Sequence, residues 1–430
     1  MVTAPQPQSA AGDGSRIDLS MVVEQLWQPV PGGSGTYIRE LAAALALRDD
    51  VRLTGIRARS PRSQQAPASA AQALTGAGEV TPGQAAAGPT APAPTEPSPP
   101  AVASAIARPE LQGLPASMRV RQSRLPRAAL YQAWTRLRWP AVPGLVASGR
   151  QVIHATTWAV PPRSVPLVVT VHDLAFVRNP EFFTARGVQF FRRALQLVLR
   201  QADVVVVPSW ATAQDLVEAG MEADRIHVIP HGVQAVPVTA QEVEHFKHTQ
   251  GLHRPYIMWC GAIEPRKNLT TLLEAFRQVA SASDCDLVLV GPAGWGGEHD
   301  ALTRALAALP EGRVHLTGSL PWQQVHAAYA GARAFAFPSI WEGFGMPVLE
   351  AQAHGVPVVT SQDTAMAEVC GQGALLVPAT DAQALAQVLL DAVGPQHQVL
   401  SQASLANAAH YTWQRSASQH MKAYQAALDS

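Results

Sequence analysis

The sequence has few of the features that mark disulfide scaffolds or membrane spans. Its 430 residues include three cysteines, Cys260, Cys285 and Cys370, which are far apart and odd in number. They predict no disulfide framework and fit a reducing compartment. No apolar run reaches the roughly 18 residues that a membrane-spanning helix needs. The first 20 residues lack the basic start and apolar core of a secretory signal, so we expect a cytoplasmic protein.

Excess charge and the common metal motifs are also missing. Lys and Arg number 32 and Asp and Glu number 32, so the formal net charge is zero. This balance argues against a nucleic-acid-binding protein with a global basic field. The sequence has no G-x-x-x-x-G-K-[ST] phosphate loop, no H-E-x-x-H and no spaced set of cysteines and histidines. We therefore expect no resident metal or cofactor.

One long segment lacks the residues that build a core. From Ser63 to Ala107 the chain is almost wholly Ala, Pro, Gly, Ser, Thr and Gln, with no aromatic residue. Such a segment cannot bury enough apolar surface to offset its chain entropy. We predict a disordered insertion over residues 61–117, and a disordered N-terminus over residues 1–15.

In the rest of the chain, apolar runs typical of buried strands alternate with helical patterns, which indicates a doubly wound α/β fold. A helix with a glycine turn before it is expected within residues 31–50. The expected strands are 17–23, 51–57, 151–160, 166–174, 202–209 and 225–233 in the first half, and runs beginning at 256, 286, 313, 334, 356 and 374 in the second.

The most informative stretch is residues 334–360. A short apolar strand, AFAF, is followed by the loop Glu342-Gly343-Phe344-Gly345, and Pro347 is well placed to begin a helix. Gly355 is the expected helix stop, and VPVVT begins the next strand. Loop amides and a helix N-terminus that face one point bind anions. Glu342 and Glu350 beside that point suit sugar or ribose hydroxyls, so a sugar nucleotide is indicated; the alternative is an ordinary tight turn.

Two glutamates with seven residues between them, around G-F-G-x-P and before G-x-P-V-V, resemble the signature of the retaining glycosyltransferases of family four, which have the GT-B fold and an E-x7-E motif. The resemblance implies two Rossmann-like domains that face a central cleft, with a C-terminal helix crossing back to the first domain. The implied parts are an acceptor-binding domain (16–235), a linker (236–253), a nucleotide-sugar-binding domain (254–410) and the crossover helix (411–430).

Arg266-Lys267-Asn268, at a predicted helix N-terminus, is suited to clamping phosphate, although a solvated basic turn is the alternative. The string G-x-I-E-P-R-K-N resembles the family's diphosphate-binding segment. The resemblance implies that Arg266 and Lys267 neutralise the diphosphate, Glu342 holds the donor sugar and Glu350 holds the ribose. The full implied donor-binding set is Arg266, Lys267, Glu342, Gly343, Phe344, Gly345, Met346, Pro347, Val348, Glu350, Gly318, Leu320 and Gly33.

His172 follows a predicted strand in V-T-V-H-D-L. Ligands of open parallel sheets bind beyond the carboxyl ends of strands, so His172 is expected at the cleft. A structural histidine is the alternative. The segment resembles the histidine loop of sugar-transferring family members, which implies that His172 contacts the donor sugar and counts with Glu342, Arg266 and Lys267 as catalytic. Gly32, Gly33 and Gly35 are candidates for close backbone approach to a substrate.

Residues 119–139 are basic and carry several large apolar side chains. We predict a helix here. One interpretation is contact with an anionic membrane or a pyrophosphate-linked lipid at the acceptor site. The other is a domain helix with a solvated arginine face.

Together these features predict transfer of a hexose, with retention, from a nucleotide-sugar to a glycan or a lipid-linked acceptor. The resemblance favours GDP-mannose as the donor and bacterial surface polysaccharide as the product. A UDP-hexose donor is the alternative within this class. A nucleotide-sugar epimerase or a catalytically silent binding subunit are alternatives outside it, because fold alone does not fix function.

Overall fold

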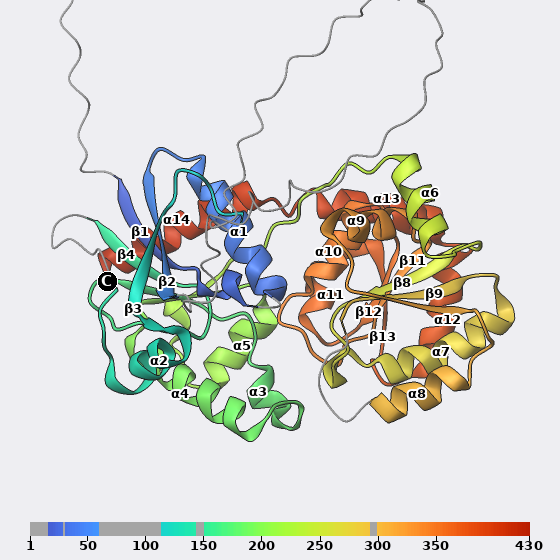
Figure 1. The fold of residues 1–430 in the computed structure, drawn as a ribbon, viewed down its shortest axis with the longest axis horizontal. Helices are drawn as coiled ribbons and strands as arrows, with labels where there is room; N and C mark the ends of the chain where they lie inside the picture. The colour runs from blue at the N-terminus through green and yellow to red at the C-terminus, as the bar shows by residue number, and fades with distance from the viewer. Residues whose placement is uncertain (1–15, 29–30, 60–112, 143–149, 293–298) are drawn as a thin grey trace, which may run out of the picture.

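The computed structural model describes residues 16–28, 31–59, 113–142, 150–292 and 299–430. Two α/β units lie beside each other, each with a sheet covered by helices (Figure 1). Every strand pair in both sheets is parallel. The predicted GT-B architecture of two Rossmann-like domains is confirmed. Most predicted residues of the disordered N-terminus and of the insertion lie outside the described residues.

In spatial order, the first sheet contains β3 (Arg119–Pro126), β2 (Val51–Arg59), β1 (Ile17–Val22), β4 (Gln151–Ala155), β5 (Leu167–Thr170), β6 (Val204–Val207) and β7 (Ile226–Val228). The second contains β10 (Val314–Gly318), β9 (Asp286–Val290), β8 (Tyr256–Cys260), β11 (Ala334–Phe337), β12 (Val358–Ser361) and β13 (Ala374–Val377). In each sheet the strand order reverses beside the first strand. Crevices that bind ligands form at such points, beyond the carboxyl ends of the strands.

The helices of the first unit are α1 (Gly32–Ala46), α2 (Arg127–Gln132), α3 (Ala175–Arg178), α4 (Ala185–Gln201) and α5 (Trp210–Glu218). Those of the second are α6 (Ala240–Thr249), α7 (Leu269–Ala282), α8 (His299–Ala307), α9 (Trp322–Gly331), α10 (Met346–Ala353), α11 (Ala365–Val369), α12 (Ala382–Val393) and α13 (His397–Ala408). The last helix, α14 (Trp413–Asp429), returns to the first unit (Figure 1). Within the described ranges, no helix combines the length and apolarity needed to cross a bilayer.

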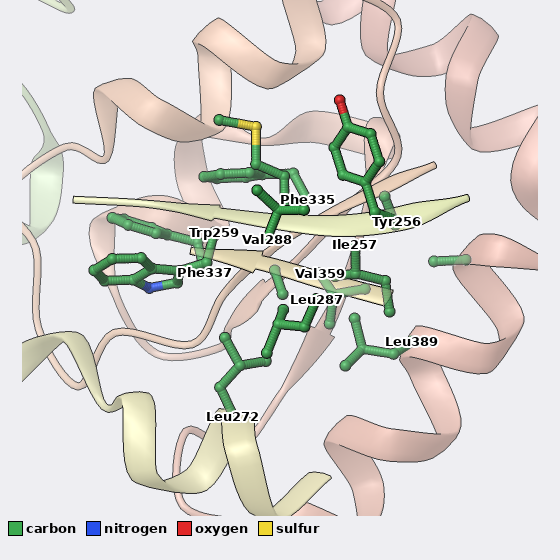
Figure 2. Packing of buried hydrophobic residues seen from close by; sticks show 14 of the residues in the cluster. Tyr256, Ile257, Trp259, Leu272, Leu287, Val288, Phe335, Phe337, Val359 and Leu389 are labelled. Carbon is green, nitrogen blue, oxygen red and sulfur yellow. The ribbon is translucent and has the colours of Figure 1, made fainter. Parts of the chain in front are cut away.

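The core of the second unit forms on both faces of its sheet. Side chains of β8 and β11, among them Trp259, Phe335 and Phe337, are fully buried, and Leu272 of α7 and Leu389 of α12 pack against the sheet (Figure 2). Parallel sheets covered on both faces need near-continuous apolar strands, which explains why the sequence pattern located these strands.

A chain of buried polar groups fastens α14 to the first sheet. The His420 Nδ1–H of α14 must donate to the Ser416 carbonyl at 2.8 Å, since a carbonyl only accepts. Its Nε2 therefore accepts from the Tyr37 hydroxyl of α1, at 2.8 Å. The Tyr37 oxygen then accepts from Thr170 of β5, also at 2.8 Å.

The same chain of groups continues to β4. Thr170 accepts from His154 Nε2–H at 2.7 Å, and His154 Nδ1 accepts from the Tyr424 hydroxyl at 2.9 Å. All of these side chains are buried. Every proton has a single position as long as both histidines are neutral, so the network joins one end of the chain to the centre of the first sheet.

Residues 119–139 differ from the predicted helix. Arg119–Pro126 form β3, at the edge of the first sheet, and a helix begins only at Arg127. Ser123 is buried while the adjacent Gln122 and Arg124 are exposed, because one face of an edge strand packs on the domain and the other meets water. Several arginines masked this alternation in the sequence.

Three predicted boundaries also shift. The glycines at 32, 33 and 35 belong to the first turns of α1 and do not form a separate turn before it. Leu114, inside the predicted insertion of 61–117, is buried in the described part of the first unit. In the predicted linker of 236–253, Phe246 and Leu252 belong to the core of the second unit.

Candidate active site

The predicted cations and the first glutamate follow β8 and β11, which are neighbours in the second sheet. Arg266 and Lys267 lie in the turn Pro265–Lys267 after β8, and Glu342 lies in the loop between β11 and α10. The Ile340 N–H donates to the Arg266 carbonyl at 2.8 Å and joins the two loops. The three side chains therefore meet at one edge of the sheet.

Glu342 is the centre of a largely buried ion-pair cluster. Its Oε1 accepts from Arg266 Nη1 at 2.7 Å and from Lys267 Nζ. Arg266 Nε also donates to Glu264 Oε2, at 3.0 Å. The exposed fraction of these side chains is only 8–22%. Because water is largely excluded, the charges interact more strongly than they would on the surface.

The cluster is charged at neutral pH. Burial favours a raised pKa for Glu342, but the charges of Arg266 and Lys267 outweigh burial and lower it to about 2. Burial lowers the pKa of Lys267 more than the carboxylate raises it, whereas the nearby carboxylates overcome burial and raise the pKa of Arg266. The lowered pKa of Glu342 favours a charged pair, whereas the lowered pKa of Lys267 favours a neutral lysine. The ionised carboxylate in hydrogen-bond contact keeps the proton on Lys267.

Two glycines shape the loop that follows Glu342. Gly345 has a φ of +89°, a conformation that residues with a Cβ rarely adopt. Gly343 lies against the first unit, because a Cβ on it would be 1.8 Å from the His172 carbonyl oxygen. The Ser209 hydroxyl donates to the Gly343 carbonyl at 2.7 Å. The loop thus turns into α10 and also contacts the first unit.

The start of α10 offers fewer amides than the predicted Phe344–Val348. Pro347 has no N–H, and the Val348 N–H donates to the Gly345 carbonyl at 2.9 Å. Among the described residues, no acceptor is found for the amides of Phe344, Gly345 and Met346. These three amides, reinforced by the helix dipole, are available to an anion.

Glu350 lies one turn into α10 and contacts a different group. Its Oε2 accepts from the Tyr329 hydroxyl of α9 at 3.1 Å. Tyr329 is fully buried, while Glu350 is partly exposed. Burial raises the pKa of Glu350, and the hydrogen bond from Tyr329 opposes this effect. Glu350 therefore has its own supporting group, separate from the arginine–lysine cluster.

His172 follows β5, on the first unit's side of the site. Its Nε2–H donates to the Thr156 carbonyl at 3.0 Å, and the Tyr37 ring packs edge-on with centroids 5.0 Å apart. Burial lowers the pKa of His172, which keeps the imidazole neutral. Since the proton lies on Nε2, the Nδ1 atom is left as an acceptor.

The remaining predicted residues lie in two places, one near α10 and the other at β10. Gly33 lies near α10, because a Cβ on it would be 3.9 Å from Met346 Sδ. Gly318 is the last residue of β10 and Leu320 follows it; β10 is the edge strand that β9 separates from β8. Gly318 is exposed and has a φ of +66°. The structure thus gathers a central group around Glu342 and leaves this pair at the edge of the sheet.

Sequence reasoning missed two groups that support the site. Glu264 was within the quoted motif, yet its role as a second counter-ion of Arg266 was not predicted. Tyr329 gave no signal, because its contact with Glu350 joins residues 21 positions apart.

Both halves of the chain match described families. Residues 31–235 match Glycosyltransferase Family 4, and residues 240–409 match Glycosyl transferases group 1. O-antigen chain mannosyltransferase B of Escherichia coli is 28% identical over 282 residues, which cover 64% of this chain and 74% of that protein. D-inositol 3-phosphate glycosyltransferase of Corynebacterium diphtheriae is 30% identical over 271 residues. That match covers 58% of this chain and 62% of the relative, so the chain spans less than two thirds of its length.

The fold has close counterparts among solved structures. Anabaena HepE in complex with UDP and glucose superposes with a TM-score of 0.65 and 17% identity, over 95% of this chain and 98% of that one. Two parallel-sheet units with a site at their contact define the GT-B class of proteins. With the family matches to both halves, the chain is identified as a GT-B glycosyltransferase.

Proposed function

We propose that the protein transfers a hexose, with retention, from a nucleotide-sugar to a hydroxyl of a glycan or lipid-linked acceptor. The observation that carries the proposal is that Arg266 and Lys267 bind Glu342, two residues before the amides of residues 344–346, which have no acceptor among the described residues. Two cations and a helix N-terminus suit a diphosphate. Glu342 and Glu350, on either side, suit the hydroxyls of sugar and ribose.

The comparisons support two candidate donors. The Escherichia coli relative is named a mannosyltransferase of O-antigen chains, which supports GDP-mannose and a role in polysaccharide synthesis. HepE has been crystallised with UDP-glucose, which keeps a UDP-hexose as the second candidate. We expect the protein to act in the cytoplasm. We also expect it to need no metal, since cations and dipoles of the chain itself would neutralise the diphosphate.

The ion-pair cluster suggests how the donor is engaged. The diphosphate takes the place of Glu342 on Arg266 and Lys267, which frees the Glu342 carboxylate for the donor sugar's hydroxyls. His172 Nδ1 accepts a hydrogen bond from the sugar across the contact between the units. The acceptor oxygen then bonds to the anomeric carbon on the face from which the diphosphate leaves. A diphosphate oxygen takes the acceptor's proton, and the two cations stabilise the departing charge.

The first experiment is nucleotide release from GDP-, UDP-, ADP- and dTDP-sugars, with a chelator present and with or without extracted lipid-linked glycans. Release of one nucleotide that depends on the acceptor supports a metal-independent transferase and identifies its donor. An epimerase would convert the donor sugar without an acceptor. Thermal stabilisation by a nucleotide with no release from any sugar would support a silent binding subunit.

We also propose peripheral contact with an anionic membrane through one face of the first unit. The segments 119–139 and 182–201 contain ten arginines and no acidic residue, in a chain of zero net charge. They pack together through Tyr131 and Phe190, whose ring centroids are 6.4 Å apart. Leu137 and Trp139 are 72% and 60% exposed beside them. Arginine with exposed aromatic and aliphatic side chains suits a lipid headgroup region.

Vesicle sedimentation tests this contact. Vesicles of phosphatidylcholine with phosphatidylglycerol should bind the protein, and pure phosphatidylcholine should bind it far less. The double variant Arg192→Glu, Arg193→Glu should lose binding, because both side chains are exposed on α4. Equal sedimentation with both vesicle types would contradict the proposal.

A further inference from the structure

The hydroxyl of Tyr329 donates a hydrogen bond to the carboxylate of Glu350, which belongs to the proposed donor site. The tyrosine hydroxyl comes from α9 and reaches the carboxylate of α10 at 3.1 Å. The hydroxyl also lies against the Cys260 thiol at the end of β8. It is therefore a deep contact between three elements and not a surface pair.

The Tyr329 ring has little freedom to move. It is fully buried, stacked on His354 with an interplanar angle of 11°, and packed against Phe335 with ring centroids 5.4 Å apart. Glu350, by contrast, is a long and partly exposed side chain that would otherwise occupy several rotamers. Because the Tyr329 hydroxyl is fixed in place, its hydrogen bond sets the orientation of the more flexible Glu350 carboxylate.

The hydrogen bond also leaves part of the carboxylate available. An ionised carboxylate has about four acceptor positions on its two oxygens. Tyr329 uses one of them, on Oε2, which leaves Oε1 and the rest of Oε2 for a ligand with two neighbouring hydroxyls. A ribose diol is such a ligand.

We propose that Tyr329 is a positioning residue for the nucleoside: it holds Glu350 in the orientation that accepts both ribose hydroxyls. This inference rests on the proposed binding of a nucleotide-sugar at this site. In this proposal Tyr329 does not touch the ligand, and its removal weakens the binding of the nucleotide-sugar. Turnover at saturating donor should be nearly unaffected, because the anomeric carbon lies at Glu342.

The test compares Tyr329→Phe with the wild type, using two pairs of probes. The pairs are GDP with 2′,3′-dideoxy-GDP, and UDP with 2′,3′-dideoxy-UDP, in binding by calorimetry. For the ribonucleotide that the wild type binds, the variant should raise the Kd about tenfold, the effect expected for losing a hydrogen bond to a charged group. For the dideoxy form the change should stay below about twofold, because the hydroxyls that Glu350 accepts are gone.

Tyr256→Phe is the matched control. Tyr256 is also fully buried in the second unit, and its hydroxyl donates to the Ala328 carbonyl of the same α9 at 2.6 Å. Tyr256→Phe should leave the Kd of the ribonucleotide and the Kd of its dideoxy form unchanged. Glu350→Gln provides a second test. When Tyr329→Phe is added to Glu350→Gln, the affinity for GDP or UDP should show no further loss.

The outcomes separate the two proposals. If the wild type binds neither GDP nor UDP, the proposed function fails and the inference fails with it. If the wild type binds a ribonucleotide better than its dideoxy form, but Tyr329→Phe weakens both equally or neither, only the role of Tyr329 is overturned. An equal loss in Tyr256→Phe would also overturn it, since a general loosening of α9 would then explain the result.

Discussion

Gly343 of the second unit lies directly against the backbone of His172 in the first, since a Cβ on Gly343 would stand 1.8 Å from the His172 carbonyl oxygen. The obstructing atom belongs to the backbone, so no side chain can turn aside to make room. The two units can therefore meet at the site only because this position is glycine.

Gly343→Ala should keep the units from closing. Turnover should fall by about one to two orders of magnitude, because small displacements of reacting groups are costly. Nucleotide binding to the second unit should change little, which serves as the internal control. Normal turnover in a variant of wild-type thermal stability would show that this contact is not needed.

Glu342→Ala, Arg266→Ala and Lys267→Ala should each reduce turnover by orders of magnitude while the fold survives. In the proposed mechanism the cations stabilise the departing diphosphate, and Glu342 holds the donor sugar. Steady-state kinetics with the identified donor measure the effect, with circular dichroism to confirm folding. Glu274→Ala, on the exposed face of α7, is the matched control and should retain activity. Near-normal turnover in folded Glu342→Ala would contradict the assignment.

Glu368 of α11 caps a helix of the other unit. Its Oε2 accepts from the Trp210 N–H at 2.9 Å and its Oε1 from the Ala211 N–H at 2.7 Å, at the first turn of α5. Glu368→Ala should weaken the closed arrangement by about 1 kcal/mol, the usual value of a helix cap.

Small-angle scattering should then show a more extended average shape than in the wild type. Glu222→Ala removes an exposed carboxylate from the first unit alone and should leave the scattering profile unchanged. Identical profiles for Glu368→Ala and the wild type would argue against a role for this cap in closure.

The polar network under α14 predicts acid sensitivity. Burial lowers the pKa of His420 from 6.5 to about 4, so the folded state favours neutral imidazole. The stability that depends on this neutral form is complete above pH 6.5 and is lost as the pH falls toward 4, by roughly 3 kcal/mol for a shift of this size.

Thermal unfolding between about pH 7.5 and 4 measures this loss, a range that spans the folded and unfolded pKa values. His420→Gln should be less stable at neutral pH but should lose less stability on acidification, because no buried imidazole remains at that position to be protonated. His245 is on the exposed face of α6, so His245→Gln is a control that should follow the wild type. Parallel curves for wild type and His420→Gln would refute the linkage.

The strand, glycine loop and helix of residues 334–360 could be predicted because their signals are local. The apolar AFAF run, Pro347 and Gly355 each constrain their own backbone, and Gly355 has the expected left-handed φ of +71°. β3 was missed because an edge strand buries only one face, so its arginine-rich pattern also fits a helix.

Contacts between distant residues had no signal in the sequence. Glu342 meets Lys267 across 75 positions, and Tyr37 meets His420 across 383. Family resemblance predicted a set of site residues, but it did not predict that the two cations pair with Glu342 or that Tyr329 contacts Glu350. Such pairings depend on how two sheets and their loops are placed in space.

The return of α14 to the first unit determines where this protein can be divided. Trp413, Ala417 and Tyr424 are part of the same core as Leu19 and Ile38. A truncated protein that ends near residue 235 would expose that apolar surface and lose His420, one of the two hydrogen-bond partners of the Tyr37 hydroxyl. A chimaera that exchanges the second unit should therefore keep α14 with its native first unit and join the foreign unit at two points, near residues 235 and 412.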